Sequence, residues 1–262
     1  MHIRPATLED HALFVRLMPE LEVDDPPPDA AKWANELQPN TLVAEREGVP
    51  VGVCTFVPLE GAGHIRMLIT DPRARRVGAG RALLEEAARR LRVAGCTKWT
   101  LNVKPQNVAA IALYVSMGFA KDYSAQALRF PWTELDTLPP SPAVQSRLVT
   151  PADDRALENL FSLSNGQIEG LRKAKRILLT LTDGAGEVLA LSAYDPKFPG
   201  AFPFRVKEPM LARALLEAMR PHALPGAEWT GVVVENDAPL AKLLIAHGAS
   251  VRMDIDHYAG AL

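Results

Sequence analysis

The stretch LITDPRARRVGAGRALLEEA, from Leu68 to Ala87, decides the fold of this chain. An apolar strand pattern ends at Thr70, a turn begins at Asp71, and apolar residues recur at helical spacing after Gly80. The first amides of a helix have no intrahelical carbonyl to bond, and the helix dipole places partial positive charge beside them. The stretch therefore predicts a strand that leads through an anion-binding loop into a helix.

The loop from Arg75 to Gly80 carries the residue types that a pyrophosphate requires. Glycines at positions 78 and 80 allow the backbone to approach phosphate oxygens closely. Charge-assisted hydrogen bonds can come from three arginines, Arg75, Arg76 and Arg81. An ordinary strand-to-helix turn with solvated arginines is the alternative, and an isolated Gly-x-Gly does not distinguish the two. A Walker loop is excluded because Gly-Lys-Ser/Thr is missing, and a dinucleotide fingerprint is excluded because Leu83 replaces its third small residue.

A second segment, NVAAIALYVSMGF, runs from Asn107 to Phe119 and predicts a further helix. Asn107 suits the N-cap of this helix, and Gly118 suits its C-terminal end. Taken alone, each of these residues has that ordinary structural role, and Tyr114 is a core or surface tyrosine. Their joint spacing after the glycine loop favours a functional site.

Together the two segments resemble the GCN5-related N-acetyltransferases (GNAT). The family pattern L-x-V-x-P-x-x-R/Q-x-x-G-x-G/A is matched at Leu68, Pro72, Arg75, Gly78 and Gly80, with Thr70 in place of valine. The pattern N-x-x-A-x-x-x-Y-x-x-x-G-F is matched at Asn107, Ala110, Tyr114, Gly118 and Phe119. The resemblance is strong over about residues 1–130 and weak in the second half.

The resemblance implies that acetyl-coenzyme A is the cofactor. No metal site is expected, because His222, His247 and His257 have no metal-ligand spacing. The loop would bind the pyrophosphate of the cofactor, and the preceding strand would bind the pantetheine arm through its backbone. The expected cofactor-binding residues are Leu68, Ile69, Thr70, Arg75, Arg76, Val77, Gly78, Ala79, Gly80, Arg81 and Asn107.

The resemblance also implies direct attack of an uncharged amine on the acetyl thioester. Backbone N–H groups near Leu68 to Thr70 would bond the oxyanion. Tyr114 corresponds to the general acid of the family. A phenol with a pKa of about 10 can stabilise or protonate a leaving thiolate with a pKa of about 8.5.

The general base is less clear, because Arg66 stands where many family members have a glutamate. His64 lies two residues earlier on the same face of the strand and titrates in the useful range, so it is the candidate base, directly or through water. The alternative for His64 is a histidine at the rim of a hairpin. Glu60 is a second candidate or a solvated turn residue. Arg66 could instead orient the carboxylate of an acidic acceptor.

The acceptor is expected to be the amine of a small molecule or a peptide. Asp24 and Asp25 follow the first predicted helix, where relatives gather contacts to the acceptor, and could bind a cation; solvated turn acids are the alternative. The formal net charge of −2 gives no electrostatic reason to expect nucleic acid or a membrane as partner. The two cysteines, Cys54 and Cys96, do not form a disulfide framework, which fits a reducing compartment. The sequence shows no signal-peptide pattern and no apolar stretch long enough to span a membrane, so a cytoplasmic location is expected.

An internal repeat divides the chain of 262 residues into two similar halves. RLVTPADD near Thr150 resembles IRPATLED near Thr7, and ARALLEAM resembles GRALLEEA, with Arg213 lying 132 positions after Arg81. We expect an α/β (α+β) fold of two tandem GNAT-like domains, each a mixed, mostly antiparallel sheet flanked by helices. The expected division is a catalytic domain at 1–137, a proline-rich linker at 138–145 and a second domain at 146–262.

The second half lacks the residues of the predicted site. Counted from the repeat, Met210 and Ala212 replace the loop glycines, and Leu244 replaces Tyr114. This domain is therefore expected to be catalytically silent, and the chain to be a monomer that acts as a pseudo-dimer, or a homodimer. Two other functions stay open: a non-catalytic acyl-coenzyme A sensor or protein-interaction module, and a purely structural tandem. Release of free thiol and stabilisation by coenzyme A distinguish these functions.

Overall fold

The computed structural model describes residues 1–22, 26–59 and 61–262, which fold into two compact units. The first unit consists of Met1–Asp122 and His257–Leu262, and the second of Tyr123–Asp256. These bounds differ from the expected division, because the predicted linker at 138–145 lies inside the second unit. Leu135 and Leu138 are buried in the core of that unit, so the chain is already part of it before the proline-rich segment begins.

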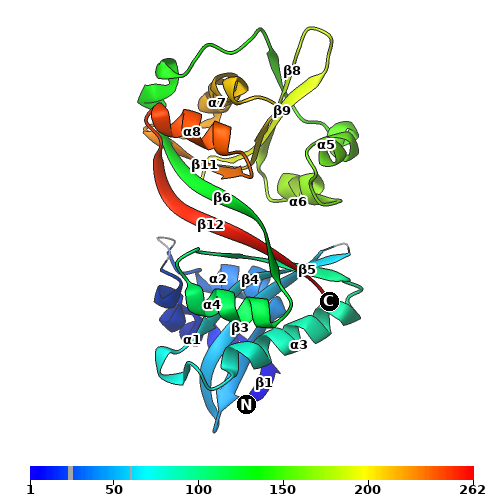
Figure 1. The fold of residues 1–262 in the computed structure, drawn as a ribbon, viewed down its shortest axis with the longest axis vertical. Helices are drawn as coiled ribbons and strands as arrows, with labels where there is room; N and C mark the ends of the chain where they lie inside the picture. The colour runs from blue at the N-terminus through cyan, green and yellow to red at the C-terminus, as the bar shows by residue number, and fades with distance from the viewer. Residues whose placement is uncertain (23–25, 60) are drawn as a thin grey trace. The chain divides into compact units, whose positions relative to one another are not determined.

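The sheet of the first unit consists of β1 (His2–Pro5), β2 (Thr41–Arg46), β3 (Val49–Leu59), β4 (Ala62–Thr70) and β5 (Lys98–Val103), joined by the end of β12 (Figure 1). The neighbours from β1 to β4 are antiparallel, whereas β4 and β5 are parallel. The middle of β3 is buried on both faces, which explains its continuous run of small and apolar residues, VGVCTF.

Two layers of helices cover this sheet. On one face lie α1 (His11–Leu17), α2 (Ala30–Lys32), a π-helical turn (Trp33–Leu37) and short 3-10 turns at Leu8–Asp10, Met18–Leu21 and Gln38–Asn40. On the other face lie α3 (Ala79–Val93) and α4 (Val108–Ser116), which Figure 1 shows in front of the sheet. Leu83, Leu84 and Leu91 of α3 are fully buried, and each contributes about 1.5–3 kcal/mol to the free energy of unfolding.

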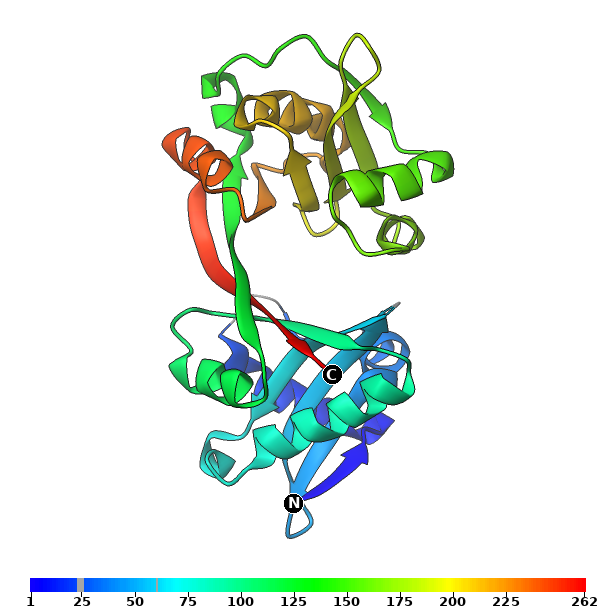
Figure 2. The same ribbon diagram turned by 45° about the vertical axis from the view of Figure 1, so that its right-hand side comes forward.

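The second unit repeats this arrangement. Its strands are the end of β6 (Ala120–Pro131), β7 (Gln145–Leu148), β8 (Ile177–Thr182), β9 (Val188–Asp195), β10 (Gly200–Val206), β11 (Trp229–Glu235) and the start of β12 (Ser250–Ala261). One face is covered by α5 (Asp154–Leu160) and α6 (Gln167–Lys173), and the other by α7 (Ala212–Met219) and α8 (Ala238–Ala246), as Figure 2 shows. The remaining 3-10 turns are Pro72–Ala74, Trp132–Thr137, Pro151–Asp153, Pro209–Leu211 and Arg220–His222.

The start of each unit carries the same polar motif, which supports the repeat seen in the sequence. Thr7 and Asp10 form a capping box, and Arg4 donates two hydrogen bonds to the Asp10 carboxylate. The second copy has the same capping box and the same two bonds, made by Arg147, Thr150 and Asp153. The Arg4 guanidinium lowers the pKa of Asp10, as Arg147 does for Asp153. The expected fold of two tandem domains is confirmed.

The last residues of the chain form a strand of the first unit. Leu262 N donates to Thr97 O (2.9 Å), and Tyr258 is buried beside Tyr114 and Phe119 in the α3/α4 core. In the first unit β12 therefore lies beside β5, just as β6 lies beside β11 in the second unit. In the described part of the chain, no helix is long and apolar enough to cross a membrane.

Candidate active site

A gap opens inside the first unit's sheet where β4 and β5 separate. The two strands are paired only over Ala62–Ile65 and Lys98–Leu101, although β4 continues to Thr70 and β5 to Val103. On its other edge β4 stays bonded to β3 as far as Thr70 opposite Gly52. The N–H and C=O groups that face the gap have no strand to pair with, so they can bond an extended ligand.

A β-bulge at Arg66 marks the point where the gap begins. Thr55 pairs with Met67 and Phe56 with Ile65, which leaves Arg66 as the extra residue of β4. A bulge changes which way the following side chains point. Ile65 thus packs into the α3/α4 core, whereas Ile69, four residues later, packs under α1 and α2. The exposed Arg66 occupies the position where a glutamate base was sought.

The loop after β4 is held in place by Asp71. Its N–H donates to Val51 O (2.8 Å), and its buried carboxylate accepts hydrogen bonds from the backbone N–H of Arg73 (3.0 Å) and from Arg16 (2.8 Å). The arginine partners hold the pKa of the Asp71 carboxyl far below its usual range. These bonds tie the start of the loop to β3 and to α1.

The glycines of the loop have different roles. Gly78 precedes α3 with a φ of +87°, in the left-handed region that favours glycine. The first intrahelical bond runs from Ala82 N to Gly78 O, so the amides of residues 79–81 have no carbonyl of the helix to bond. A Cβ on Gly80 would lie 3.1 Å from Leu113 Cδ2, so this glycine allows α4 to pack closely against the start of α3.

Two of the three loop arginines already have partners. The Arg75 guanidinium contacts the Glu20 carboxylate at 2.6 Å, and Arg81 donates to Ser116 Oγ at 2.7 Å. Arg76 is exposed and has a φ of +64°. A pyrophosphate at the start of α3 would therefore compete with Glu20 for Arg75.

Tyr114 lies on α4, buried and directed toward the β3/β4 region. Burial raises the pKa of its phenol, and the neighbouring Cys54 thiol adds to that effect. Cys54 is paired with Leu68 across β3 and β4, which places the phenol near the part of β4 that borders the gap. Asn107 caps α4, accepting a hydrogen bond from Ala110 N (3.1 Å) through its side chain.

His64 is less suited to act as a base than its residue type suggests. The half-buried imidazole lies with Nδ1 at 2.8 Å from Thr100 Oγ1. Burial lowers its pKa to about 4, and the charges of His257 and Arg66 act in the same direction. His64 is thus neutral near pH 7 and accepts a proton only weakly. Glu60, the second candidate base, lies outside the described residues, as do Asp24 and Asp25, the expected contacts to a cationic acceptor.

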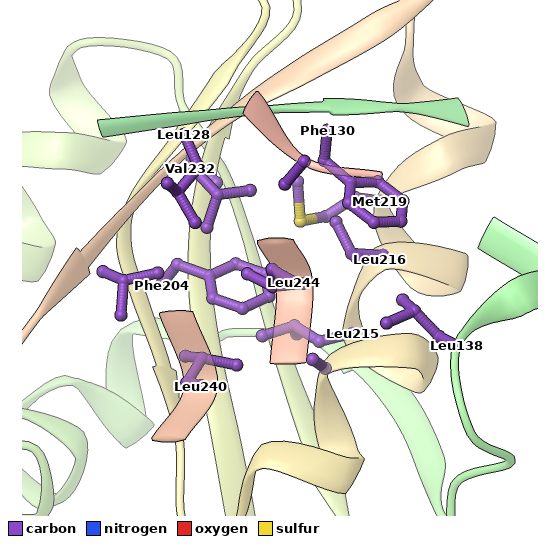
Figure 3. Close-up of a cluster of buried hydrophobic side chains, with 14 of the residues drawn as sticks. Leu128, Phe130, Leu138, Phe204, Leu215, Leu216, Met219, Val232, Leu240 and Leu244 are labelled. Carbon is purple, nitrogen blue, oxygen red and sulfur yellow. The ribbon is translucent and has the colours of Figure 1, made fainter. Parts of the chain in front are cut away.

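The corresponding place in the second unit is filled by the chain itself. Ser141 Oγ accepts a hydrogen bond from Ala214 N (3.0 Å) at the start of α7 and donates one to Met210 O (2.6 Å). Pro209 has no N–H to offer an anion. Figure 3 shows Leu244, at the position of Tyr114, packed with Leu240 among the buried side chains of this unit.

Comparison with known proteins gives a family match within the first unit. Residues 11–119 match the acetyltransferase (GNAT) family model. The chain carries a GNAT-family domain. That family and its fold support acyl transfer as the chemistry of the first unit. No curated protein sequence matches the chain.

Solved structures extend the GNAT fold to the whole chain. A GCN5-related N-acetyltransferase from Sphaerobacter thermophilus has a TM-score of 0.70 at 15% identity, covering 99% of this chain and 95% of that one. A putative acetyltransferase from Pyrococcus horikoshii has a TM-score of 0.71 at 16% identity, covering 100% and 89%. A tandem GNAT protein from the clavulanic acid biosynthesis pathway has a TM-score of 0.64 at 18% identity, covering 99% and 98%. At these identities the likeness shows the fold alone.

Sequence reasoning did not find several residues that shape the candidate site. Asp71 directly follows the strand, and an aspartate before proline at a loop start is a typical N-cap signal. Glu20 and Leu113 have no such signal, because their contacts with Arg75 and Gly80 join segments far apart in the sequence.

Proposed function

We propose that the chain is an acetyl-coenzyme A-dependent N-acetyltransferase with one cofactor site, in the first unit. The observation that carries this proposal is the open edge of β4, which leads along Leu68–Thr70 to the free amides at the start of α3. An elongated ligand with a peptide-like arm and an anionic end matches that sequence of donors and acceptors.

Each part of the site has a chemical task in this proposal. The amides of residues 79–81 and the loop arginines bind the pyrophosphate, and the open edge of β4 bonds the pantetheine arm. The backbone N–H groups of Leu68–Thr70 stabilise the oxyanion that forms when an uncharged amine attacks the thioester carbonyl. Coenzyme A supplies the activated acetyl group and leaves as a thiolate. Because burial keeps the Tyr114 phenol protonated, that residue can donate a proton or a hydrogen bond to the leaving sulfur.

The acceptor is proposed to be the amine of a small molecule or a peptide. The second unit is proposed to be catalytically silent, which is supported by Ser141 at the start of α7 and by Leu244 in place of the phenol. One cofactor molecule per chain is therefore expected.

Two measurements test the proposal. Calorimetric titration with coenzyme A should give one site per chain, and a thiol-release assay with acetyl-coenzyme A should show turnover with members of a panel of primary amines. A stoichiometry of two would contradict the silent second unit. Binding without thiol release from any amine would instead support a non-catalytic acyl-coenzyme A sensor. Arg66 in place of a glutamate base and the weakly basic His64 favour that alternative.

A further inference from the structure

A groove lies at the edge of the second unit's sheet, between β7 and one side of α7. Its volume is about 460 Å³, which is within the range of ligand-binding pockets. Its apolar walls are formed by Leu148 on β7, Leu179 and Leu181 on β8, and Ala218 on α7. Leu148 is 58% exposed. The second unit therefore leaves apolar surface open to solvent at this edge.

The first unit fills the corresponding place with one of its own side chains. Ser146 precedes Arg147 in the second copy of the Arg-Thr-Asp motif, as Ile3 precedes Arg4 in the first copy. Ile3 packs against the core under α3, whereas the smaller Ser146 lines the groove. The groove is thus a feature of the second unit that the repeat alone does not explain.

The helix beside the groove is shorter than its counterpart in the first unit. α3 runs from Ala79 to Val93, whereas α7 ends at Met219 and is followed by a 3-10 turn that contains Pro221. The helical donor for the carbonyl of Glu217 would be the N–H of residue 221, which a proline lacks. The end of α7 therefore carries a carbonyl without its helical partner and the negative end of the helix dipole.

The side chain of Glu217 adds negative charge to the groove that it lines. Its Oε1 accepts a hydrogen bond from Arg213 (2.8 Å), and the same guanidinium also binds the Asp136 carboxylate (2.9 Å). One guanidinium faces two carboxylates, which leaves one excess negative charge. The charge of Arg147, which also lines the groove, is balanced by two bonds to the Asp153 carboxylate. The groove is therefore complementary to a cation.

The outer edge of β7 can pair with a further strand. In the described part of the chain no strand lies on that side of β7, and its four residues are exposed. Val149 N donates to Leu178 O (2.9 Å), which continues the pairing of β7 with β8. Since the bonds of an antiparallel strand alternate between its two sides, the N–H and C=O groups of Ser146 and Leu148 face away from β8. The first unit has Pro5 at the position of Leu148, so β1 lacks the outward N–H that β7 keeps.

We propose that this edge of the second unit binds an extended peptide segment that carries a lysine or arginine side chain. The segment pairs with β7, and its side chain opposite Ser146 enters the groove. The aliphatic stem takes the place that Ile3 fills in the first unit, and the cationic head lies beside Glu217 and the end of α7. This binding is independent of the proposed acetyl transfer, because it uses the unit that lacks the cofactor residues.

Fluorescence anisotropy with the full chain tests the proposal. The probe is a fluorescein-labelled peptide, Val-Thr-Lys-Thr-Val, which places the lysine and both valines on the α7 face when the lysine lies opposite Ser146. It should bind about tenfold more tightly than the same peptide with glutamate in place of lysine. Equal binding of the two peptides, or no binding of the lysine peptide at about 1 mM, overturns the proposal.

Two variants locate the binding in the groove. Ser146→Ile copies the side chain of the first unit and fills the groove, so it should weaken binding of the lysine peptide about tenfold. Glu217→Gln should weaken it about 1.5- to 5-fold, as expected for an exposed ion pair. Glu169→Gln on α6 is the matched control, because Glu169 also forms an i,i+4 pair on a helix of the second unit. Unchanged binding by Ser146→Ile contradicts the proposal.

Leu148→Pro replaces Ser146→Ile if that variant does not fold. It copies Pro5 and removes an N–H that faces away from β8, so binding of the lysine peptide should again fall about tenfold. Coenzyme A affinity should equal that of the wild type in each variant, because the proposed cofactor residues lie in the first unit. Absence of coenzyme A binding in the wild type would contradict the proposed function and not this peptide site.

Sedimentation velocity distinguishes the peptide from a second copy of the chain as the occupant. A wild-type chain that stays monomeric while it binds the lysine peptide supports the proposal. A dimer that Leu148→Pro dissociates and the lysine peptide leaves intact would place a second copy on β7 and overturn it.

Discussion

Replacing Glu20 with glutamine should strengthen binding of coenzyme A. In the structure Arg75 is engaged by the Glu20 carboxylate at 2.6 Å, and a pyrophosphate must replace that partner. The side chains of Arg75 and Glu20 are 53% and 32% exposed. Exposed ion pairs of this kind are worth about 0.2–1 kcal/mol. Releasing Arg75 beforehand should therefore raise the affinity by about 1.5- to 5-fold.

Isothermal titration with coenzyme A at low and high NaCl concentration measures this effect. The gain should be smaller at high salt, because screening weakens the competing pair. Glu86→Gln is the matched control: Glu86 also pairs with arginines, Arg89 and Arg90, but further along α3. A double-mutant cycle with Arg75→Gln should abolish the gain. Weaker binding in Glu20→Gln, or an equal gain without Arg75, would refute the competition between carboxylate and pyrophosphate.

Three further outcomes are expected. Tyr114→Phe should lower turnover about 10²-fold in the thiol-release assay with little change in coenzyme A affinity. Tyr194 is a buried tyrosine of the second unit, and Tyr194→Phe should change neither quantity. Turnover of Tyr114→Phe equal to that of the wild type would show that Tyr114 is not the general acid. Ser141→Ala should lower the free energy of unfolding by about 0.5–2 kcal/mol in urea titrations, because Ala214 N loses its acceptor, and should leave coenzyme A affinity unchanged. The pKa of His64 falls from 6.5 in the unfolded chain to about 4 in the folded protein, so the free energy of unfolding is highest above pH 6.5 and falls as the pH drops toward 4. Over that window the wild type should lose about 3 kcal/mol more of its free energy of unfolding than His64→Gln. Equal losses would contradict the burial of this imidazole.

The local features of the fold could be predicted because short-range physics determines them. The helix after the loop begins at Ala79, directly after the left-handed Gly78, and Asn107 caps the helix that bears Tyr114. Both helices were expected from capping residues and apolar spacing. The tandem fold was predictable for a related reason, since the repeat left the same Arg-Thr-Asp motif at both starts.

Features that depend on contacts between distant segments could not be predicted. The bulge at Arg66 arises from how β3 and β4 pair along their length. The expected boundary near residue 137 followed from the prolines at 138–145, but β6 and β12 each contribute residues to both units. His64 was chosen for its residue type, whereas its basicity depends on burial and on His257, nearly two hundred positions away.

The placement of His257–Leu262 in the first unit has a consequence for how the protein is made. During synthesis the first 122 residues leave the ribosome long before the strand that belongs beside β5. The α3/α4 core then lacks Tyr258, and the edge of β5 stays open until β12 has been synthesised. Assembly of the first unit is thereby coupled to completion of the second. Removing as few as the last six residues should therefore damage the unit that the chain builds first.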